Sequence, residues 1–371
     1  MINWQRIWND DGSSSRYSPA KTIAYILSLI YRLVIVSLSR LYASKFFPEV
    51  RLSCPVISVG NITVGGTGKT PCVIWLAQML QKHGYKPAVL SRGYGSHGSG
   101  PVNIVSDGRN ILLSGAMAGD EPLLMARTLP GVPVITGPKR LLTGRTAIDK
   151  FRVNVLLCDD AFQHRQIYRD INIVLLDSLA PLGNGYLLPR GPLREPPSAL
   201  GRADVIIATR GDVTGETDSL IAELAQAGNI PLFRSIHRAC AVIRGDYALQ
   251  LPLNELRGKK IYAFAGIGKP SSFKKSILDI GAQVVSFDIF PDHHRYNRQE
   301  LEKISNNFSQ SGADLILTTE KDAMRLQEFA DFIPTVYLMR ISIEIVPDRD
   351  LLEKYILEKL RPGKGASIAS Q

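Results

Sequence analysis

Apolar and polar positions alternate regularly along most of the chain. From Pro55 onward, short apolar runs alternate with longer stretches of helical character. Apolar runs of about four to eight residues bounded by glycine, proline or polar residues are typical of buried strands. The predicted strands comprise residues 55–59, 87–91, 132–136, 153–159, 171–177, 204–210, 261–267, 284–290, 315–319 and 335–339. Strands separated by helices predict right-handed βαβ units and a mainly parallel sheet that is covered on both faces.

The predicted strands fall into two series, which indicates two α/β lobes. Residues 102–113 are expected to form a hairpin, with Asp107 and Gly108 in its turn. Residues 232–258 separate the two series and are expected to cross from one lobe to the other. The expected domains are an N-terminal helix (1–45), a first large domain (46–240), a second lobe (241–345), and a C-terminal helix with a frayed tail (346–371).

A long apolar segment, residues 22–42, precedes the alternating region. On a helix, Lys21, Ser28, Arg32 and Ser39 would lie on one narrow polar stripe. The rest of the circumference is apolar and needs either a protein core or lipid to cover it. The late start of the segment, its arginines and the lack of a small-residue cleavage site argue against a secretory signal peptide.

The arginines of this segment favour a helix that lies in a membrane interface. Arg32 and Arg40 would each cost roughly 2.5–3.5 kcal/mol near the centre of a bilayer. In the interface, Arg32, Arg40 and Lys45 can reach anionic headgroups. A spanning helix and a helix packed on its own protein remain open alternatives.

Composition narrows the class of protein. The chain has 371 residues, of which 45% are hydrophobic and 21% charged, so it can bury a substantial core and is not mainly disordered. The formal net charge of +10 weakly indicates anionic partners. The basic residues are spread along the chain without a recognition motif, so we expect no nucleic-acid binding.

The cysteines indicate a reducing compartment. Cys54, Cys72, Cys158 and Cys240 lie far apart, without C-x-x-C spacing and without histidines at metal-ligand spacing. Buried, reduced thiols in a cytosolic environment are the expectation, with neither a zinc site nor a disulfide.

The strongest local signal is VGNITVGGTGKTP (59–71), which lies between a predicted buried strand and a predicted helix. Its glycines let the backbone turn N–H groups toward a phosphate, while Lys69 can reach the β and γ oxygens and Thr70 can bind Mg²⁺. Thr63 departs from the strict motif, which has glycine there. The predicted nucleotide-binding residues are Gly65, Gly66, Thr67, Gly68, Lys69 and Thr70.

A P-loop also needs an acid at the end of a neighbouring strand to hold the metal. Asp159 and Asp160 follow the apolar run that begins at Val153. The carboxyl ends of parallel strands are where α/β sheets bind ligands. The sequence therefore predicts metal binding by this pair, although one of the two carboxylates could instead cap a helix.

These motifs belong to a longer series that resembles the tetraacyldisaccharide 4'-kinase family, whose members phosphorylate a disaccharide lipid of the lipid A pathway. The matching segments are SVGNITVGGTGKTP (58–71), LSRGYG (90–95), GDEPLLMA (119–126), DDAFQHR (159–165), LLPRGPLREP (187–196), FAGIGKPSSF (264–273), FPDHHRY (290–296) and TTEKDAMRL (318–326). One such motif would be weak evidence, whereas eight in family order are highly specific. Ala161 stands where the family more often has glycine, which is expected to affect a turn rather than the chemistry.

The resemblance implies an α/β fold: a P-loop NTPase-type, mainly parallel sheet with a second, smaller α/β lobe and an N-terminal membrane-associated helix. It implies ATP and Mg²⁺ as cofactors, and transfer of the γ-phosphate to the 4'-hydroxyl of a tetraacyldisaccharide 1-phosphate lipid. The expected location is the cytoplasmic face of the inner membrane, and the expected state is a monomer. Acyl-chain preference cannot be predicted, because lipid pockets are made of generic apolar residues.

The resemblance also implies roles for two residues that are remote in the sequence. Asp120 corresponds to the family's base for the acceptor hydroxyl, and His293 to its partner, which orients the carboxylate or relays the proton. The two are expected to meet only when the lobes close. His294 is the competing histidine, and the choice between His293 and His294 stays open.

Further residues of the matching motifs suit phosphate or metal. Arg194 is expected to act on phosphate together with Lys69, because a guanidinium offers a planar fork to phosphate oxygens. The expected metal ligands are Thr70, Asp159, Asp160 and Glu195, and the expected substrate-binding residues are Arg92, Arg140 and Gln163. Residues 318–322 could close over the nucleotide, or Thr319 and Asp322 could cap a helix.

Two alternatives belong to other functional classes. A P-loop ATPase or GTPase of the metal-insertion or partitioning type shares GGxGKT, but such proteins usually have lysine where this chain has Val64. The guanine-specifying N-K-x-D is missing, and residues 209–212 (TRGD) imitate it weakly. A membrane-bound nucleotide sensor is the non-catalytic alternative, in which the GDEP and DHH residues would be idle.

Overall fold

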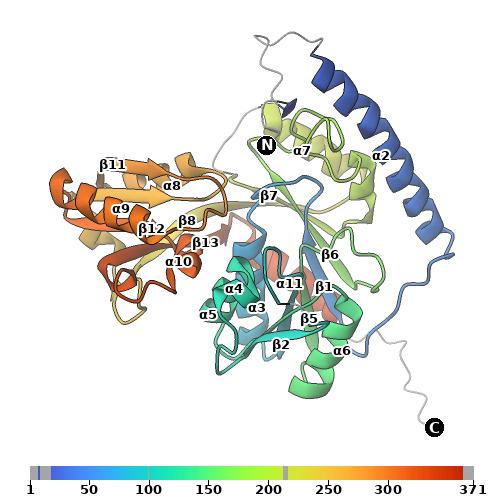
Figure 1. Cartoon of the computed structure of the whole chain (residues 1–371). Coiled ribbons are helices and arrows are strands. Elements are labelled where there is room, and N and C mark those ends of the chain that lie inside the picture. The colour runs from blue at the N-terminus through green and yellow to red at the C-terminus, as the bar shows by residue number, and fades with distance from the viewer. Residues whose placement is uncertain (1–6, 9–17, 99, 212–215, 362–371) are drawn as a thin grey trace. The chain divides into compact units, whose positions relative to one another are not determined.

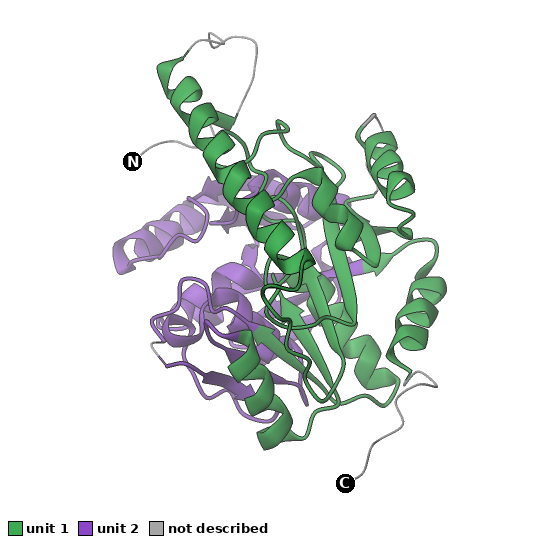
Figure 2. Cartoon of the chain, turned by 90° about the vertical axis from the view of Figure 1, so that its right-hand side faces the viewer, with its two compact units in different colours: residues 1–90, 140–236, 344–371 green, residues 91–139, 237–343 purple. Residues whose placement is uncertain are grey.

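The computed structural model describes residues 7–8, 18–98, 100–211 and 216–361. Within it the chain forms two compact units (Figure 2): unit 1 comprises residues 1–90, 140–236 and 344–371, and unit 2 comprises residues 91–139 and 237–343. The division differs from the expected domains, because residues 91–139 join unit 2, and the expected N-terminal (1–45) and C-terminal (346–371) segments both belong to unit 1. The expected frayed tail, residues 362–371, lies outside the described residues.

Unit 1 is built on a parallel sheet. Its strands, in spatial order, are the first residues of β8 (Leu232–Arg244), then β7 (Val205–Thr209), β6 (Ile171–Asp177), β1 (Val56–Gly60), β5 (Val155–Asp159) and β2 (Pro87–Ser91). Every residue of β1, β5, β6 and β7 is buried, as expected for continuous apolar strands covered on both faces. The helices of the unit are α2 (Pro19–Ala43), α3 (Lys69–Lys82), α6 (Arg140–Phe151), α7 (Glu216–Ala227) and α11 (Arg349–Leu360), with the 3₁₀ helix η1 (Pro197–Arg202).

Unit 2 contains a second group of parallel strands, which belongs to the same 13-stranded sheet. Its strands are, in spatial order, β11 (Gln283–Ile289), β10 (Lys260–Ala265), β12 (Leu315–Thr319) and β13 (Val336–Ile345). β3 (Asn103–Asp107) and β4 (Pro133–Thr136) form an antiparallel pair, and β9 (Gln250–Leu251) pairs antiparallel with β8. The helices are α4 (Gly115–Ala118), α5 (Asp120–Thr128), α8 (Pro270–Asp279), α9 (Arg298–Ser311) and α10 (Glu320–Leu326), with the 3₁₀ helices η2 (Leu253–Leu256) and η3 (Ile333–Thr335).

Helix packing in each unit positions the residues of interest. α3 packs against β1 and β5, and α8 packs against β10 and β11. α10 contacts both α4 and α5, which joins the segment 91–139 to the rest of unit 2. The predicted fold class, a mainly parallel α/β sheet with a second lobe and an N-terminal apolar helix, is confirmed.

Two segments differ in detail from the sequence expectations. In the expected hairpin at 102–113 the turn forms, with Asp107 accepting the main-chain N–H groups of Arg109 and Asn110, but the second arm contributes only a bridge between Ser106 and Ile111. The expected crossover at 232–258 begins with the long strand β8, along which the chain passes from unit 1 to unit 2.

Helix α2, the long blue helix in Figure 1, buries only part of its polar stripe, because Arg32 is exposed. Lys21 and Ser28 are buried, and the side chain of Tyr31 donates to the Arg194 carbonyl oxygen at 2.9 Å. The opposite face carries exposed apolar side chains: Ile23, Ile26, Leu27, Ile30, Leu33 and Val34. Among the described residues α2 is the one helix long and apolar enough to cross a membrane, and it is therefore a candidate membrane anchor.

Candidate active site

The glycine-rich segment forms the connection between β1 and α3. Gly65 and Gly68 have positive φ values of 117° and 85°, which side chains with a Cβ rarely adopt. Inside the loop, the buried Asn61 donates its side-chain amide to the Thr67 hydroxyl at 3.0 Å. Thr63, the departure from the strict motif, is buried and bridges to Leu193, so a residue larger than glycine fits there. The P-loop thus leads directly into the N-terminus of α3, where backbone N–H groups favour an anion.

Asp160 holds the two cations next to this loop. One oxygen of its carboxylate lies 3.7 Å from Lys69 Nζ, and Arg194 Nη1 donates to both oxygens at 2.8 and 2.9 Å. Burial alone would raise the pKa of the Asp160 carboxyl, but Lys69 and Arg194 lower it below its ordinary value. Asp160 also has a positive φ of 48°, a backbone strain of the kind that collects at functional sites.

Three further residues of unit 1 that were predicted to bind metal or substrate form hydrogen bonds with their neighbours: Glu195, Gln163 and Arg140. Glu195 is buried and accepts two hydrogen bonds from Arg202 Nη2, both at 2.8 Å. Gln163 donates to Glu195 and to the carbonyl oxygen of Asn61, at 3.0 and 2.9 Å. Arg140 is buried and donates to the Asp159 carbonyl oxygen at 3.3 Å.

These contacts link Lys69 and Arg194 through Asp160, and Gln163 with Glu195, all within unit 1. Arg92 is exposed and belongs to unit 2. Within the described part of the chain, no group of three or more His, Cys, Asp and Glu side chains is arranged to hold a metal by itself.

An arginine that the sequence did not single out also contacts the loop. Arg210 follows β7 with a positive φ of 59°, and its Nη2 donates to the Gly66 carbonyl oxygen at 3.0 Å and to Asp177 at 2.7 Å. It belongs to the TRGD segment that imitates a guanine motif, whose Asp212 lies outside the described residues. The signal available was an arginine after a predicted strand, which is too common to assign a role.

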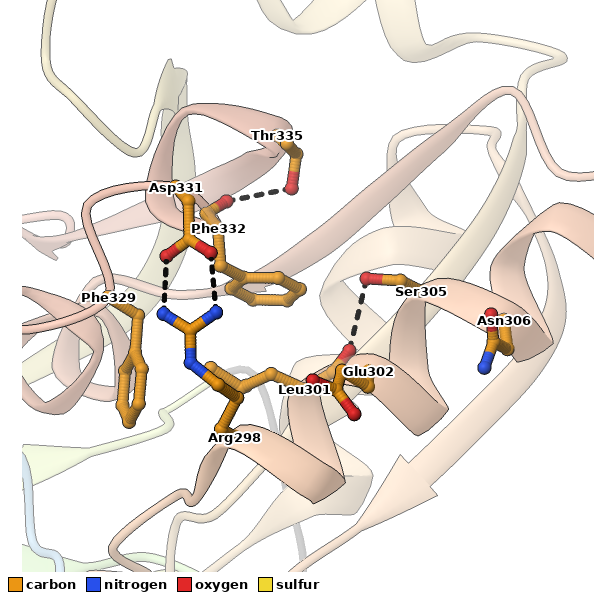
Figure 3. Close-up of a pocket in the computed structure, with 9 residues that line it drawn as sticks. All are labelled: Arg298, Leu301, Glu302, Ser305, Asn306, Phe329, Asp331, Phe332 and Thr335. Carbon is orange, nitrogen blue, oxygen red and sulfur yellow. Dashed lines mark hydrogen bonds and ion pairs between the residues drawn. The ribbon is translucent and has the colours of Figure 1, made fainter.

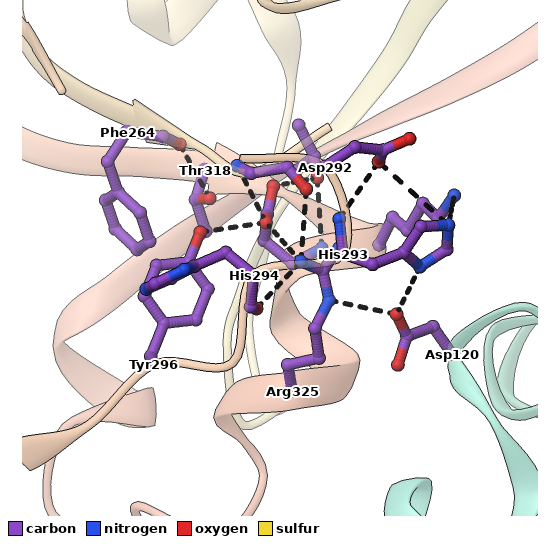
Figure 4. Close-up of polar contacts among 12 residues, drawn as sticks. Asp120, Phe264, Asp292, His293, His294, Tyr296, Thr318 and Arg325 are labelled. Atoms are coloured by element: carbon purple, nitrogen blue, oxygen red, sulfur yellow. Dashed lines mark hydrogen bonds and ion pairs between the residues drawn. The ribbon is translucent and has the colours of Figure 1, made fainter. Parts of the chain in front are cut away.

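Unit 2 contains the predicted base and its partner. Asp120 is the first residue of α5, and His293 lies in the loop after β11 (Figure 4). His293 Nδ1 is 3.2 Å from Asp120 Oδ2. Both residues belong to unit 2, so they meet within one unit rather than only on lobe closure, as their distance in the sequence had suggested.

The backbone around the pair is restricted. Gly119, just before Asp120, has a φ of 87°, and a Cβ there would lie 2.9 Å from the Tyr94 carbonyl oxygen. His293 itself has a positive φ of 59°, which is rare for a residue other than glycine. Such strain persists only where the surrounding contacts over-determine it, as at many functional sites.

Arg325 of α10 ties the pair together. Its Nε lies 3.0 Å from Asp120 Oδ2 as an ion pair, and its Nη1 donates to the carbonyl oxygens of Gly266 and His294 at 3.0 and 2.9 Å. Burial alone would raise the pKa of the Asp120 carboxyl, but the hydrogen bond from His293 and the charge of Arg325 lower it below its ordinary value. Arg325 lies in the TTEKDAMRL motif, but nothing in the sequence assigned it a role.

The structure distinguishes the two adjacent histidines. His293 faces Asp120, whereas His294 Nε2 contacts both oxygens of Glu300 at 3.0 and 3.1 Å and stacks on Phe290. The arrangement favours His293 as the partner of Asp120 and gives His294 a structural role.

The segment 318–322 caps α10. Thr319 Oγ1 accepts the Asp322 main-chain N–H at 3.0 Å, as an N-cap residue does. The fully buried Asp322 also accepts the Gly266 N–H and the Tyr296 hydroxyl, at 3.0 and 2.8 Å. The cap therefore holds the loop that carries His293, in agreement with the capping alternative.

A pocket of about 360 Å³ lies elsewhere in unit 2, between α9 and the segment that includes η3 (Figure 3). Arg298 and Asp331 form an exposed ion pair at 2.9 Å along its wall. None of the predicted site residues lines it. The pocket is therefore not part of the candidate active site.

Comparison with known proteins identifies the family. The family model described as tetraacyldisaccharide-1-P 4'-kinase (LpxK) matches residues 20–361. The chain belongs to this family. A tetraacyldisaccharide 4'-kinase of Syntrophus aciditrophicus (strain SB) is 47% identical over 368 residues, which is 97% of this chain and 98% of the relative. One of Anaeromyxobacter sp. (strain Fw109-5) is 41% identical and covers 87% of each chain.

A solved structure supports the same assignment. LpxK from Aquifex aeolicus, crystallised in complex with ATP, superposes with a TM-score of 0.75 at 32% identity, over 92% of this chain and 99% of that one. The resemblance seen in the motifs is thereby confirmed, as is the prediction of an enzyme of the kinase class. Family membership sets aside the metal-insertion or partitioning alternative.

Proposed function

We propose that this LpxK-family chain transfers the γ-phosphoryl group of ATP to the 4'-hydroxyl of a tetraacyldisaccharide 1-phosphate lipid, with Asp120 as the base. The observation that carries the proposal is that each unit supplies one of the two things that phosphoryl transfer needs. Unit 1 supplies an anion-binding loop with Lys69 and Arg194, and unit 2 supplies a half-buried carboxylate oriented by His293 and Arg325.

The nucleotide half acts through charge and backbone dipoles. A triphosphate would receive hydrogen bonds from the loop N–H groups at the start of α3 and the charges of Lys69 and Arg194. Ion pairs with Asp160 hold both cations beside the loop, so they would be positioned to contact a bound phosphate. The role of these cations is to stabilise the negative charge on the transferred group.

Mg²⁺ fits the donors beside the loop. Asp159 ends β5 directly opposite Val59 of β1, so this acid emerges next to the P-loop, and Thr70 and Asp160 add oxygen donors of the kind that Mg²⁺ prefers. Thr70 and Asp159 would hold the ion directly, and Asp160 and Glu195 would act through their neighbours, because Arg194 and Arg202 already occupy these two carboxylates. When bound, Mg²⁺ neutralises charge on the β and γ phosphates.

The acceptor half acts by taking a proton. As the 4'-oxygen bonds to the γ-phosphorus and the bond from that phosphorus to the β-γ bridging oxygen breaks, the hydroxyl proton passes to Asp120 and ADP leaves. His293 and Arg325 both contact Oδ2 of Asp120, so Oδ1 is the oxygen that would receive the proton. His293 keeps the carboxylate oriented throughout.

The membrane supplies the acceptor. The exposed apolar face of α2 carries Leu33 at 69% exposure and Ile23 at 59%, a surface that lipid would cover. We propose attachment at the cytoplasmic face of the inner membrane, in the interface rather than across the bilayer, because Arg32 lies on the exposed side. Salt extraction of membranes would release an interfacial form at least in part, whereas only detergent would release a spanning one.

The direct test combines purified protein, ATP, Mg²⁺ and the monophosphorylated lipid disaccharide, followed by mass analysis of the lipid. The proposal predicts one added phosphate, with a much faster consumption of ATP when the lipid is present. Hydrolysis of ATP at the same rate without the lipid, and no product, would contradict it and revive an ATPase.

A further inference from the structure

Lys321 lies against the side of His293 that faces away from Asp120. It is in the first turn of α10, and its Nζ is 3.5 Å from His293 Nε2 and 3.1 Å from Glu121 Oε1. The other ring nitrogen, Nδ1, is the one that faces Asp120. The imidazole therefore lies between a carboxylate and an ammonium group, all within unit 2.

Asp120 and Lys321 have opposite effects on the protonation of the His293 ring. Asp120 alone would favour a doubly protonated, positively charged imidazole, because an anion stabilises an adjacent cation. An ammonium group has only hydrogens to offer, so Lys321 is compatible with a lone pair on Nε2 and opposes a proton there. Together they favour a neutral ring with its single proton on Nδ1, donated to Asp120.

Among the remaining groups near Nε2, Asp292 carries the charge that favours a proton there, but its carboxylate lies farther from Nε2 than the Lys321 ammonium. Asp292 Oδ1 is 4.0 Å from Nε2, beyond hydrogen-bond distance, and already accepts the main-chain N–H of His293 at 3.0 Å. The other charged or titratable side chains around the pair are Arg325 and Asp322 on α10, Glu121 on α5, His294 and Arg295 in the His293 loop, Glu300 on α9, and Tyr94 and His97 in the segment before α4. Of these, His294 is paired with Glu300, and Arg295 with His97.

Glu121 explains how Lys321 is held. It follows Asp120 in the first turn of α5, and α5 packs against α10. The ion pair between Glu121 and Lys321 therefore braces the GDEP segment against the TTEKD segment, and it fixes the ammonium beside the ring.

We propose that Lys321 is a positioning residue that keeps Nε2 of His293 unprotonated. The Asp120–His293 pair can then accept one proton during the reaction, which is the proton of the acceptor hydroxyl. The proposal rests on the proposed function, in which Asp120 is the base. A pair that already carried the extra proton on the ring would leave Asp120 a weaker base.

Nitrogen-15 NMR of the full chain labelled at histidine reads the form of the ring directly. The chain has six histidines, and the signals that vanish in His293→Gln belong to His293. Near neutral pH the wild type should show a protonated Nδ1 and an unprotonated Nε2. At the same pH Lys321→Met should show proton uptake at Nε2, and Lys321→Arg should retain the wild-type pattern. A doubly protonated ring in the wild type would overturn the proposal without any variant having to fold.

Kinetics give a second readout. Lys321→Met also removes one of the charges that lower the pKa of the Asp120 carboxyl, so both effects move the acidic limb of the kcat profile to higher pH. Because the His293 side chain is 42% exposed, water screens part of the ammonium charge, and we expect kcat at neutral pH to fall only about threefold to tenfold, with KM for ATP unchanged. Lys321→Arg should restore most of the rate.

Arg298→Ala is the matched control, because it breaks the ion pair with Asp331 in the same unit away from the histidine. It should leave the pH profile unchanged. If Lys321→Met behaves like Arg298→Ala in both the NMR and the pH profile, the proposal is wrong. If Asp120→Asn keeps wild-type turnover, the proposed base is wrong instead, so the two failures are distinguishable.

Discussion

The carboxylates of Asp160 in unit 1 and Asp120 in unit 2 have similar surroundings, and we propose opposite roles for them. Each is half-buried, each contacts two basic groups, and in each the pKa is lowered by those groups against the effect of burial. In the proposed reaction the cations beside Asp160 act on phosphate, and the Asp160 carboxylate holds them in place. In the same proposal the Asp120 carboxylate is the reacting group, and His293 and Arg325 hold it. The same local electrostatics therefore does not reveal which member of an ion pair performs the chemistry.

The largest effect should come from removing the reacting carboxylate. Asp120→Asn keeps the shape and loses the proton acceptor, so kcat should fall by about three orders of magnitude. The affinity for ATP should stay within about twofold, because the nucleotide groups that we propose belong to unit 1. Steady-state kinetics together with calorimetric ATP binding would measure both, and a parallel loss of the two would remove the distinction between the carboxylates.

At Asp160, we expect the loss of a paired cation to lower kcat more than the loss of the Asp160 carboxylate itself. Arg194→Ala deletes a donor to the transferred phosphate, so kcat should fall by about a hundredfold, in the range found for loss of a single transition-state donor. Lys would restore charge without the planar fork, so Arg194→Lys should recover only part of the rate. An unchanged kcat in Arg194→Ala would assign this arginine to structure alone.

Arg210 tests whether the P-loop depends on a brace from a neighbouring strand. Arg210→Ala removes hydrogen bonds to Gly66 and Asp177, so the loop should bind ATP more weakly, with KM raised by about tenfold and kcat changed much less. Titration of ATP binding would check this. A fall in kcat at constant KM would instead place Arg210 on the transferred group.

The smallest effect concerns stability. Asp160→Asn should lower the free energy of unfolding by roughly 1–2 kcal/mol at neutral pH, because Lys69 and Arg194 lose a charged partner. The pKa of Asp160 in the folded chain is below its ordinary value of 3.8, so this stabilisation is fully present above that pH and is lost as the pH falls through the lower folded value. Denaturant unfolding across acidic pH should therefore show the gap between wild type and variant closing below about pH 4.

The comparison also explains how far the sequence could predict the site. The P-loop was predictable from local pattern, because its glycines, Lys69 and Thr70 lie in one segment of 13 residues between a strand and a helix. Asp120 and His293 are 173 positions apart, and only the family resemblance paired them. Nothing in strand order showed that residues 91–139 would join the second unit, so the expected need for lobe closure was wrong for this pair.

The sequence did not reveal residues whose side chains contact groups far away along the chain. Arg325 and Arg210 reach their contacts through side chains, and Arg210 touches a carbonyl 144 positions away. A lone arginine has many surface uses, so neither its type nor its spacing indicates such a contact. In contrast, the polar stripe of α2 was predictable from helical periodicity, although the sequence could not show that Lys21 and Ser28 would be buried while Arg32 and the apolar side stay exposed.

The central claim is that Asp120 and His293 act together as one proton-accepting pair. The most direct measurement is the single-turnover rate of phosphoryl transfer from bound ATP in Asp120→Asn, His293→Gln and the double variant. If the two residues act as one pair, the double variant should be no more than about threefold slower than Asp120→Asn. A double variant slowed by the product of the two single effects would contradict the claim.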